Sequence, residues 1–343
     1  MNFVNVLGSN KKKYRNTAVI LVLCGFLISC IRAEPSRTEF VFGTYCTITL
    51  FEQGREKHYR EVFASLREVD NLMSVNIPSS DISRVNAAAG IEAVRVNENV
   101  LKVIQRAVFF AELSGGLFDP AIGPLVSLWN IGSEYPRVPS QEEINQILPL
   151  VNWRDIEIDA ENNSVFLKNK GMALDLGAVA KGYAADAAAA VIKRSKIKRA
   201  IIDLGGNVLI YGSPSSARPW RVAIQDPKET RYTARGVLNI AAVSDDFFQS
   251  IVTSAVYERF FEEDGIRYHH ILSTFNGHPV NNGLLSVTII TPCSMDADAL
   301  STAVFAMGFE KGKELLDSLP ETDAVFIFED NSVYVTGGLD FGN

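Results

Sequence analysis

The segment Met172–Arg194, MALDLGAVAKGYAADAAAAVIKR, and the segment Arg199–Gly212, RAIIDLGGNVLIYG, share one pattern. In each, an apolar run ends in Asp-Leu-Gly, which predicts a strand that feeds a glycine turn. In the first segment the turn leads into an alanine-rich helix, whose unpaired first amides, together with Lys181, could meet a phosphate. In the second segment, Gly205 and Gly206 could let the backbone approach a ligand closely. Either segment alone is also compatible with a plain bend and a surface lysine.

The segment Ser294–Gly308, SMDADALSTAVFAMG, places two carboxylates and two hydroxyls near the start of a predicted helix. Asp298 and Thr302 stand at i and i+4 and Ser301 at i+3, so all three can project from one face and hold one cation there. The alternative is helix capping. In that case Asp296 or Asp298 favours the helix start, and the two hydroxyls bond back to the helix backbone.

Periodic segments on both sides of these motifs complete the fold prediction. Apolar residues at helical spacing predict core-packing helices over His58–Met73 and Asn99–Leu113, and a further helix over Gln141–Leu148 after a loop rich in Gly, Pro and Ser. Alternating patterns predict strands over Phe40–Phe51, interrupted at Gly43-Thr44, and over Trp220–Ile224, Leu284–Thr291 and Asp323–Val335. This mixture predicts the α+β class.

The N-terminus has the pattern of an export signal. Four basic residues precede an apolar run, Ala18–Ile28, that is too short for a comfortable membrane span. The run ends in Leu-Ile-Ser-Cys, which looks like a bacterial lipoprotein processing box, so we expect Cys30 to carry the lipid. An ordinary signal peptidase site near Ala33 is the alternative. The expected organisation is a signal peptide over residues 1–29, a tether over 30–39 and a folded domain over 40–343.

Composition limits the classes of function. The chain has 343 residues, 47% of them hydrophobic, with 33 Lys+Arg and 40 Asp+Glu. Without the signal, which holds four basic and no acidic residues, the formal charge is about −11. That balance argues against a general nucleic-acid binder, and it means that an anionic ligand needs a local metal ion, helix N-terminus or lysine. Apart from Cys30, only Cys46 and Cys293 remain; they could pair, but they make no disulfide framework or zinc site.

Short motifs recur in order over nearly all of the mature chain. They are Phe42-Gly43-Thr44, Ser83-Arg84-Val85-Asn86, Gly116-Leu117-Phe118-Asp119-Pro120 with Gly123-Pro124-Leu125 and Trp129, Asp175-Leu176-Gly177-Ala178-Val179-Ala180-Lys181-Gly182-Tyr183, Asp203-Leu204-Gly205-Gly206-Asn207, Thr253-Ser254, His270-Ile271, and Asp298-Ala299-Leu300-Ser301-Thr302. In this order they resemble the ApbE family of FAD:protein FMN transferases, which are flavin-handling lipoproteins of bacteria.

The resemblance implies an α+β fold, with mixed sheets flanked by helices in two lobes and a flavin and metal cleft between them. It implies a Mg²⁺-dependent reaction in which FAD is split at its diphosphate, FMN is transferred to a threonine hydroxyl of a target protein, and AMP is released. By this resemblance, His270 takes the proton of the attacking hydroxyl. The implied metal ligands are Ala178, Asp298, Ser301 and Thr302. The implied FAD contacts are Phe42, Asn76, Leu117, Phe118, Asp119, Asp175, Lys181 and Leu272.

The chain departs from the family pattern at three places. At Asn76 many relatives carry an aromatic residue that stacks on the flavin, a contact that an amide cannot reproduce. Ser273-Thr274-Phe275-Asn276-Gly277 keeps only the glycine of the usual Asp-Pro-x-Thr-Gly turn, and Ala255 replaces a common glycine.

Two other classes of function therefore stay open: a Mg²⁺-dependent FAD pyrophosphatase that gives FMN and AMP, and a non-catalytic FAD-binding lipoprotein. A sugar or peptide scavenging lipoprotein is a more distant alternative, because export and a lipid anchor alone would fit it as well.

The chain carries no acceptor motif of the kind that family substrates have, so we expect flavin transfer to a separate protein. The resemblance implies that this recipient is a subunit of a membrane redox pump. The expected location is a bacterial membrane, with the protein lipid-anchored and facing the periplasm, and with the inner membrane favoured.

Overall fold

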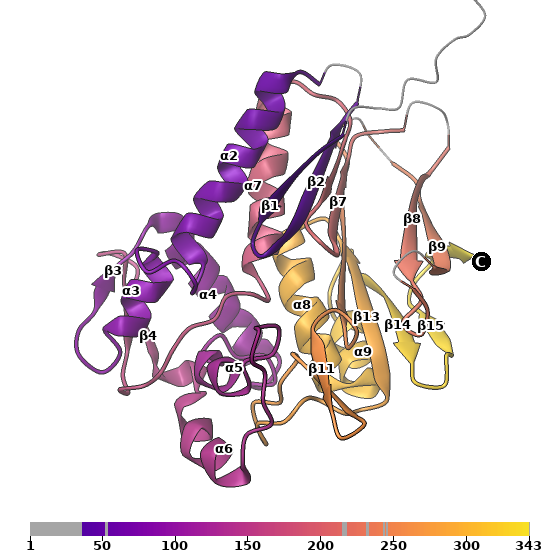
Figure 1. Ribbon diagram of the computed structural model, residues 1–343. Helices are drawn as coiled ribbons and strands as arrows, with labels where there is room; N and C mark the ends of the chain where they lie inside the picture. The colour runs from indigo at the N-terminus through magenta and orange to yellow at the C-terminus, as the bar shows by residue number, and fades with distance from the viewer. Residues whose placement is uncertain are drawn as a thin grey trace, which may run out of the picture. The chain divides into compact units, whose positions relative to one another are not determined.

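An antiparallel sheet of eight strands forms the centre of the protein (Figure 1). The computed structural model describes residues 36–342 except 52–53, 215–217, 231–232, 243 and 245. Along the sheet, the strands are β1 (Ser36–Val41), β2 (Thr44–Leu50), β6 (Ala200–Asp203), β7 (Asn207–Tyr211), β10 (Phe248–Ala255), β13 (Leu284–Thr291), β14 (Asp323–Phe328) and β15 (Val333–Val335). Each strand is antiparallel to its neighbours, so chain direction alternates across the whole sheet.

Three smaller sheets accompany the large one. They consist of β16 (Asp340–Gly342), β9 (Ala234–Ile240) and β8 (Trp220–Gln225); of β3 (Val94–Arg95), β5 (Ser164–Leu167) and β4 (Ile156–Asp159); and of the hairpin β11 (Phe260–Glu263) and β12 (Ile266–His269). The helices are α2 (Glu56–Met73), α3 (Asp81–Ala87), α4 (Glu98–Leu113), α5 (Gly123–Trp129), α6 (Gln141–Ile147), α7 (Ala180–Arg194), α8 (Ser294–Met307) and α9 (Phe309–Asp317).

The two faces of the large sheet bury different side chains, because neighbouring residues of a strand point to opposite faces. Val252 and Ile289 belong to the main core, which α2, α7 and α8 cover. Ile251 and Ile290, one position along, belong to a second core against Trp220 and the β8–β9 sheet. The central strands are therefore buried on both sides, which explains their nearly continuous apolar sequences.

The α+β class is confirmed, and the helices expected over residues 58–73 and 99–113 begin within two residues of the prediction. The strand pairs are antiparallel, and Pro35–Asn343 forms one compact unit. No described helix is long and apolar enough to cross a membrane. The predicted signal and Cys30 lie outside the described residues.

Two expectations about strands were wrong. Strand β1 begins at Ser36, inside the expected tether, because its polar residues pair across the hairpin: the Ser36 and Thr38 hydroxyls lie 2.8 and 2.9 Å from those of Thr49 and Thr47. The apolar run that begins at Met172 forms no strand. Its backbone bonds instead to a side chain, with the Leu174 N–H and C=O both paired to the Asn86 amide.

Helices α7 and α8 cap each other. The Asp186 carboxylate of α7 accepts the N–H groups of Ser294 and Met295 at the start of α8, at 3.0 and 2.9 Å. The Asp298 carboxylate of α8 accepts the Gly182 N–H in the first turn of α7, at 2.8 Å. Each carboxylate thus satisfies amides that a helix start leaves unpaired and lies where the helix dipole favours negative charge.

This contact requires glycine at position 182. A Cβ there would lie 2.2 Å from the Ser294 carbonyl oxygen and 2.7 Å from the Met295 Cα, and backbone atoms cannot rotate away. We expect Gly182→Ala to lower the free energy of unfolding by about 3 kcal/mol or more, measured by chemical denaturation. Gly338→Ala, where a Cβ meets nothing within 4 Å, is the control and should change little. Equal stability of the two variants would show that α7 and α8 can separate freely.

Candidate functional site

The carboxylate of Asp298 is the only charge that α8 contributes beside the start of α7. The residue is 4% exposed, and among the described residues only its Oδ2 accepts a hydrogen bond, the one from Gly182. Burial raises the pKa of this carboxyl, while the Lys181 ammonium and the Gly182 N–H oppose that rise. A buried carboxylate with one paired oxygen can both cap α7 and offer its second oxygen to a cation.

Of the two hydroxyls predicted for this face, that of Ser301 bonds back to the helix backbone, as the capping alternative expects, and both lie within hydrogen-bond distance of Ser254. Ser301 Oγ donates to the Asp298 carbonyl at 2.9 Å, and Ser254 Oγ of β10 lies 2.8 Å from Ser301 Oγ and 3.0 Å from Thr302 Oγ1. Ser301 is fully buried and bonded on both sides, whereas Thr302 is half-buried. The hydroxyl closest to open space is therefore that of Thr302.

The Ala178 carbonyl completes an oxygen-rich set. In a regular helix start the Gly182 N–H would bond to this carbonyl, but here it is diverted to Asp298. Among the described hydrogen bonds, none reaches the Ala178 oxygen. The diverted amide thus leaves a free carbonyl and a free carboxylate oxygen at the same helix start.

These donors fit Mg²⁺, which usually takes one or two carboxylates, neutral oxygens and several waters. The described residues contain no group of three or more His, Cys, Asp or Glu that could hold a metal. Ala178, Asp298 and Thr302 would hold the ion, and Ser301 would support them.

Lys181 acts electrostatically on three groups of this region. Its ammonium influences the pKa of Asp298 on α8, of His270 after β12 and of Cys46 on β2. These groups come from three distant parts of the sequence. The lysine therefore offers one positive charge close to both the metal-binding oxygens and the candidate base, as an anionic ligand of an acidic protein requires.

His270 is held as a neutral base. Its backbone N–H and its ring Nδ1 both bond to the Arg259 carbonyl, at 3.1 and 3.2 Å. A carbonyl can only accept, so Nδ1 carries the proton and Nε2 is left as an acceptor. Burial of the ring, followed by the charges of Arg259 and Lys181, lowers the pKa of His270 to about 3, which keeps the imidazole neutral at physiological pH.

The rings of the other two histidines of this region make hydrogen bonds within the fold. His269 Nε2 bonds to the Val280 carbonyl at 2.9 Å, and its Nδ1 accepts the Ile271 N–H. His278 Nε2 lies 3.0 Å from the Gln141 side-chain oxygen. Both rings are thus committed to local bonds.

Comparison with known proteins identifies the family of the chain. Residues 42–326 match the ApbE family. The chain belongs to the ApbE family. It is 38% identical to a protein of Treponema pallidum named FAD:protein FMN transferase, over 95% of this chain and 94% of that protein, and 37% identical to one of Klebsiella pneumoniae with the same name, over 80% and 83%.

Solved ApbE structures have the same fold. An ApbE protein of Thermotoga maritima superposes with a TM-score of 0.79 at 30% identity, over 88% of this chain and 96% of that one. The flavin transferase ApbE of Vibrio cholerae gives a TM-score of 0.77 at 27% identity, over 88% and 97%.

The ApbE resemblance predicted FAD contacts that the structure places at different depths. Phe42 lies at the turn between β1 and β2 with a φ of 55°, half-buried, and its N–H reaches Asp70 at 3.4 Å. Asn76 is exposed and Leu117 is half-buried. Phe118 and Leu272 are 5% and 4% exposed. Of these five, only Phe42, Asn76 and Leu117 present substantial surface for a ligand.

The Arg259 charge acts to lower the pKa of both Asp175 and His270. Asp175 accepts the Gly177 N–H at 2.7 Å, and burial raises its pKa while the Arg259 charge lowers it. We did not predict Arg259 from the sequence. A signal existed: Asp264-Gly265 is a strong hairpin turn, and pairing of β11 with β12 sets Phe260 opposite His269, hence Arg259 beside His270.

Asp119 is an anchor in this fold. Its two oxygens accept the N–H groups of Ala121 and Trp153, at 2.8 and 2.9 Å, and the residue is 6% exposed. Burial raises the pKa of Asp119 to about 6. The carboxylate of Asp119 ties the loop after α4 to the turn at Trp153. This attachment also supports Leu117, two residues before Asp119.

The raised pKa predicts a pH effect on stability. Because the pKa of Asp119 is higher in the folded than in the unfolded protein, the protonated carboxyl favours the folded state. Its contribution to the free energy of unfolding is complete below about pH 4 and is lost as the pH rises through about 6. Asp119→Asn mimics the protonated form. We expect the difference in unfolding free energy between wild type and this variant to change by about 2 to 3 kcal/mol between pH 4 and 7, measured by urea denaturation. A constant difference would contradict the prediction.

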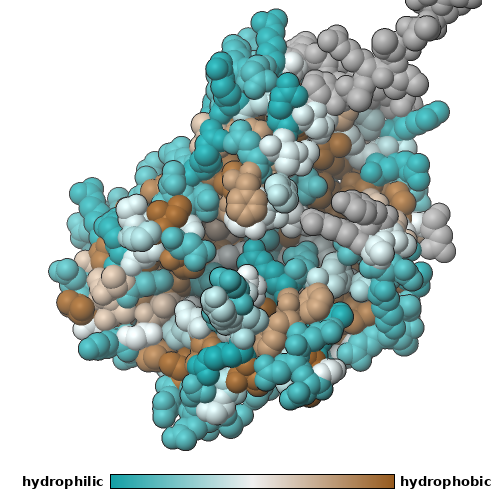
Figure 2. All heavy atoms as spheres, in the orientation of Figure 1, coloured by the Kyte–Doolittle hydropathy of each residue, from teal (hydrophilic) through white to brown (hydrophobic). Residues whose placement is uncertain are grey.

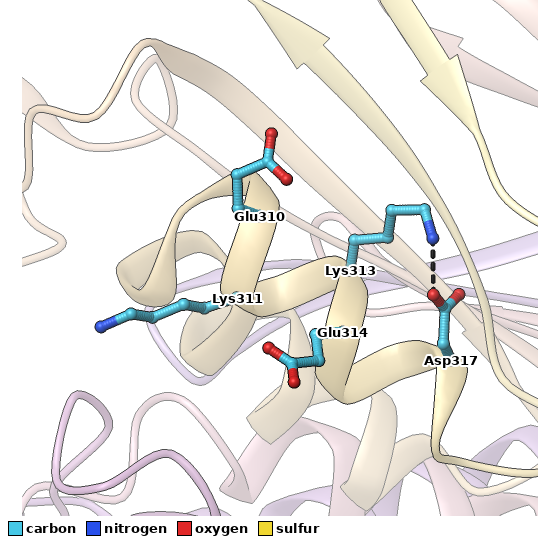
Figure 3. Close-up of a pocket in the computed structure, with 5 residues that line it drawn as sticks. All are labelled: Glu310, Lys311, Lys313, Glu314 and Asp317. Atoms are coloured by element: carbon cyan, nitrogen blue, oxygen red, sulfur yellow. Dashed lines mark hydrogen bonds and ion pairs between the residues drawn. The ribbon is translucent and has the colours of Figure 1, made fainter.

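A surface depression elsewhere has no connection with these groups. It has a volume of about 350 Å³ on α9 and is lined by Glu310, Lys311, Lys313, Glu314 and Asp317. The side chains splay outward, and Lys313 pairs with Asp317 (Figure 3). No predicted site residue lines it, so it is an ordinary charged helix surface.

Proposed function

We propose that this protein transfers FMN from FAD to a threonine hydroxyl of a target protein, in a Mg²⁺-dependent reaction that releases AMP. The observation that carries the proposal is the neutral His270, with a free Nε2, in the electrostatic reach of Lys181 and its neighbour Asp298. The chain's membership of the ApbE family and the names of its relatives support the same reaction.

Each group has one role in this reaction. His270 Nε2 accepts the proton of the threonine hydroxyl as its oxygen bonds to the FMN phosphorus, and the bond from that phosphorus to the AMP oxygen breaks. Lys181 holds the diphosphate, and Arg259 keeps the imidazole oriented through its carbonyl. Mg²⁺, when bound at Ala178, Asp298 and Thr302, supplies neutralisation of the diphosphate charge. The products are a threonine–FMN phosphodiester and AMP.

A second candidate is hydrolysis of FAD to FMN and AMP, with water in place of threonine. One observation favours it. Asn76, where many relatives carry an aromatic residue, is exposed and offers no ring to the flavin, and its N–H bonds locally to Ser74 Oγ. A less tightly held flavin leaves more room for water.

Mass spectrometry separates the candidates. The mature protein is incubated with FAD and Mg²⁺, with and without a peptide that contains a candidate acceptor threonine. A gain of one FMN on the peptide, with AMP release, supports the transferase. AMP and free FMN with an unmodified peptide support the pyrophosphatase, and bound but unchanged FAD supports storage.

We also propose that the protein is exported and lipid-anchored through Cys30, facing the periplasm from the inner membrane, with a membrane redox-pump subunit as acceptor. The basic residues, the apolar run and the Leu-Ile-Ser-Cys sequence support the anchor. Cys30→Ser should release the protein from the membrane fraction, and unchanged membrane retention would contradict lipidation.

A further inference from the structure

One end of the fold gathers positive charge. Strand β1 starts at this end, where Ser36 pairs with Thr49. The connection from β2 to α2 also lies here, because the Phe51 N–H bonds to the Arg199 carbonyl at 3.1 Å. Helix α7 ends there as α2 begins, and Ser195 Oγ reaches Glu61 at 3.4 Å. We name the exposed basic side chains of this end the basic end: Arg37, Arg55, Lys57, Arg60, Lys193, Arg194, Lys196 and Lys198.

The charge of the basic end opposes that of the rest of the protein. Its eight basic side chains are accompanied, among the described residues, by three exposed carboxylates: Glu56, Glu61 and Asp246. Only Arg37 and Lys193 form ion pairs with described residues, to Glu56 and Asp246. The mature chain is strongly acidic, so a positive surface here is a local feature. In Figure 2 the start of α2 is covered by hydrophilic residues.

The helix dipole explains the basic residues at the end of α7 but not those at the start of α2. Lys193 and Arg194 in the last turn of α7 suit the negative end of the helix dipole. At the start of α2 the dipole does not favour the basic residues: Arg55 occupies the N-cap position and makes no side-chain cap hydrogen bond, and Lys57 and Arg60 follow within two turns, with Glu56 as the one acidic residue of the first turn. Positive charge at a helix start is unfavourable for the helix, so helix stability does not account for Arg55, Lys57 and Arg60.

We propose that the basic end rests on anionic phospholipid headgroups and so sets the orientation of the enzyme on the membrane. The occupant follows from the chain itself: β1 starts at this end, and Cys30 is only six residues before Ser36. Six extended residues span at most about 20 Å. The anchor proposed above would hold the basic end near the lipid surface, where a basic surface is attracted within about one Debye length of 8 to 10 Å.

This orientation has a consequence for the site. Helix α7 has 15 residues and spans about 22 Å. Its last turn belongs to the basic end, and its first turn holds Lys181 and accepts the Asp298 cap. Contact of the basic end with headgroups would therefore hold the flavin site away from the membrane surface, where the domain of an acceptor protein can reach it.

Vesicle binding of residues 31–343, which contain the whole compact unit but no lipid, tests the proposal without the anchor. The vesicles contain equal amounts of phosphatidylglycerol and phosphatidylcholine, with pure phosphatidylcholine as the neutral comparison. The test variant carries Lys57→Glu, Arg60→Glu and Lys198→Glu. The matched control carries Arg95→Glu, Lys170→Glu and Lys311→Glu, three exposed residues outside the basic end with the same change in charge.

We expect wild type and control to bind the anionic vesicles, salt to weaken this binding, and the test variant to bind at least tenfold more weakly. FAD turnover without vesicles should be unchanged in both variants, so an inactive protein would count against the proposed function and not against this surface. Equal loss in test and control variants, or equal binding to neutral vesicles, would overturn the proposal. So would a preference of the basic end for an acidic protein over the anionic vesicles.

Discussion

Asp298→Asn is expected to reduce Mg²⁺-dependent AMP release from FAD by about a thousandfold or more. The charge of this buried carboxylate is the only negative ligand in the proposed metal site, and a metal ion contributes several kcal/mol of transition-state stabilisation, each 1.36 kcal/mol being tenfold in rate. The amide oxygen can still accept the Gly182 N–H, so α7 keeps its cap. Asparagine is therefore a cleaner substitution here than alanine, which would remove both the charge and the cap.

Two measurements accompany the rate. Burial raises the pKa of Asp298, so the ionised carboxylate is unfavourable without a cation, and the variant should unfold at the same or a higher temperature than metal-free wild type. Mg²⁺ should raise the unfolding temperature of wild type, through preferential binding to the folded state, and should not raise that of the variant. A Mg²⁺-dependent shift of equal size in both would place the ion elsewhere.

Asp296→Asn is the matched control on the same helix. Asp296 forms a two-pronged ion pair with Arg106, with both N–O distances at 2.7 Å, and lies outside the donor set. Its loss should lower stability and leave Mg²⁺-dependent turnover near wild type. If both substitutions abolished turnover, the effect would belong to the integrity of α8 and not to a metal ligand.

His270→Ala is expected to slow transfer to the threonine peptide by about 10² to 10⁴-fold, the usual contribution of a positioned general base. FAD affinity should change little, because the imidazole is neutral and adds no charge to the diphosphate site. The rate is measured in single turnover with saturating FAD and varied peptide, and FAD affinity by flavin fluorescence.

His278→Ala is the comparison, since among the described residues the ring of this histidine bonds only to Gln141, and the residue should be dispensable for transfer. If His270→Ala weakened FAD binding as much as it slowed transfer, the residue would be a binding contact. The low pKa of His270 also predicts that protonation of this base does not limit kcat/KM anywhere between pH 5 and 8.

Local sequence patterns were sufficient for much of the fold. The helical period of apolar residues located α2 and α4, because one buried face is encoded within each segment. The strands expected at β13 and β14 are also present, although both are buried on two faces and not on one. The spacing of Asp298, Ser301 and Thr302 placed three oxygen donors on one helix face before any neighbour was known.

Other features depend on contacts between distant segments. The run from Met172 looks like a strand, but the Asn86 amide takes its backbone bonds, and no local pattern records a partner 88 residues away. Arg259 reaches His270 only through the β11–β12 hairpin.

The sequence by itself therefore determined the long helices α2, α4, α7 and α8, several strands of the large sheet and the chemical types in the site, because these follow from residue spacing. Only the tertiary structure decided that Asp298 diverts the Gly182 amide and frees the Ala178 carbonyl, that Arg259 fixes the His270 tautomer, and that basic residues from α2 and α7 meet at one end. Packing of α7 against α8 and α2, and of β11 against β12, sets these distances, and packing is a property of surfaces that lie far apart along the chain.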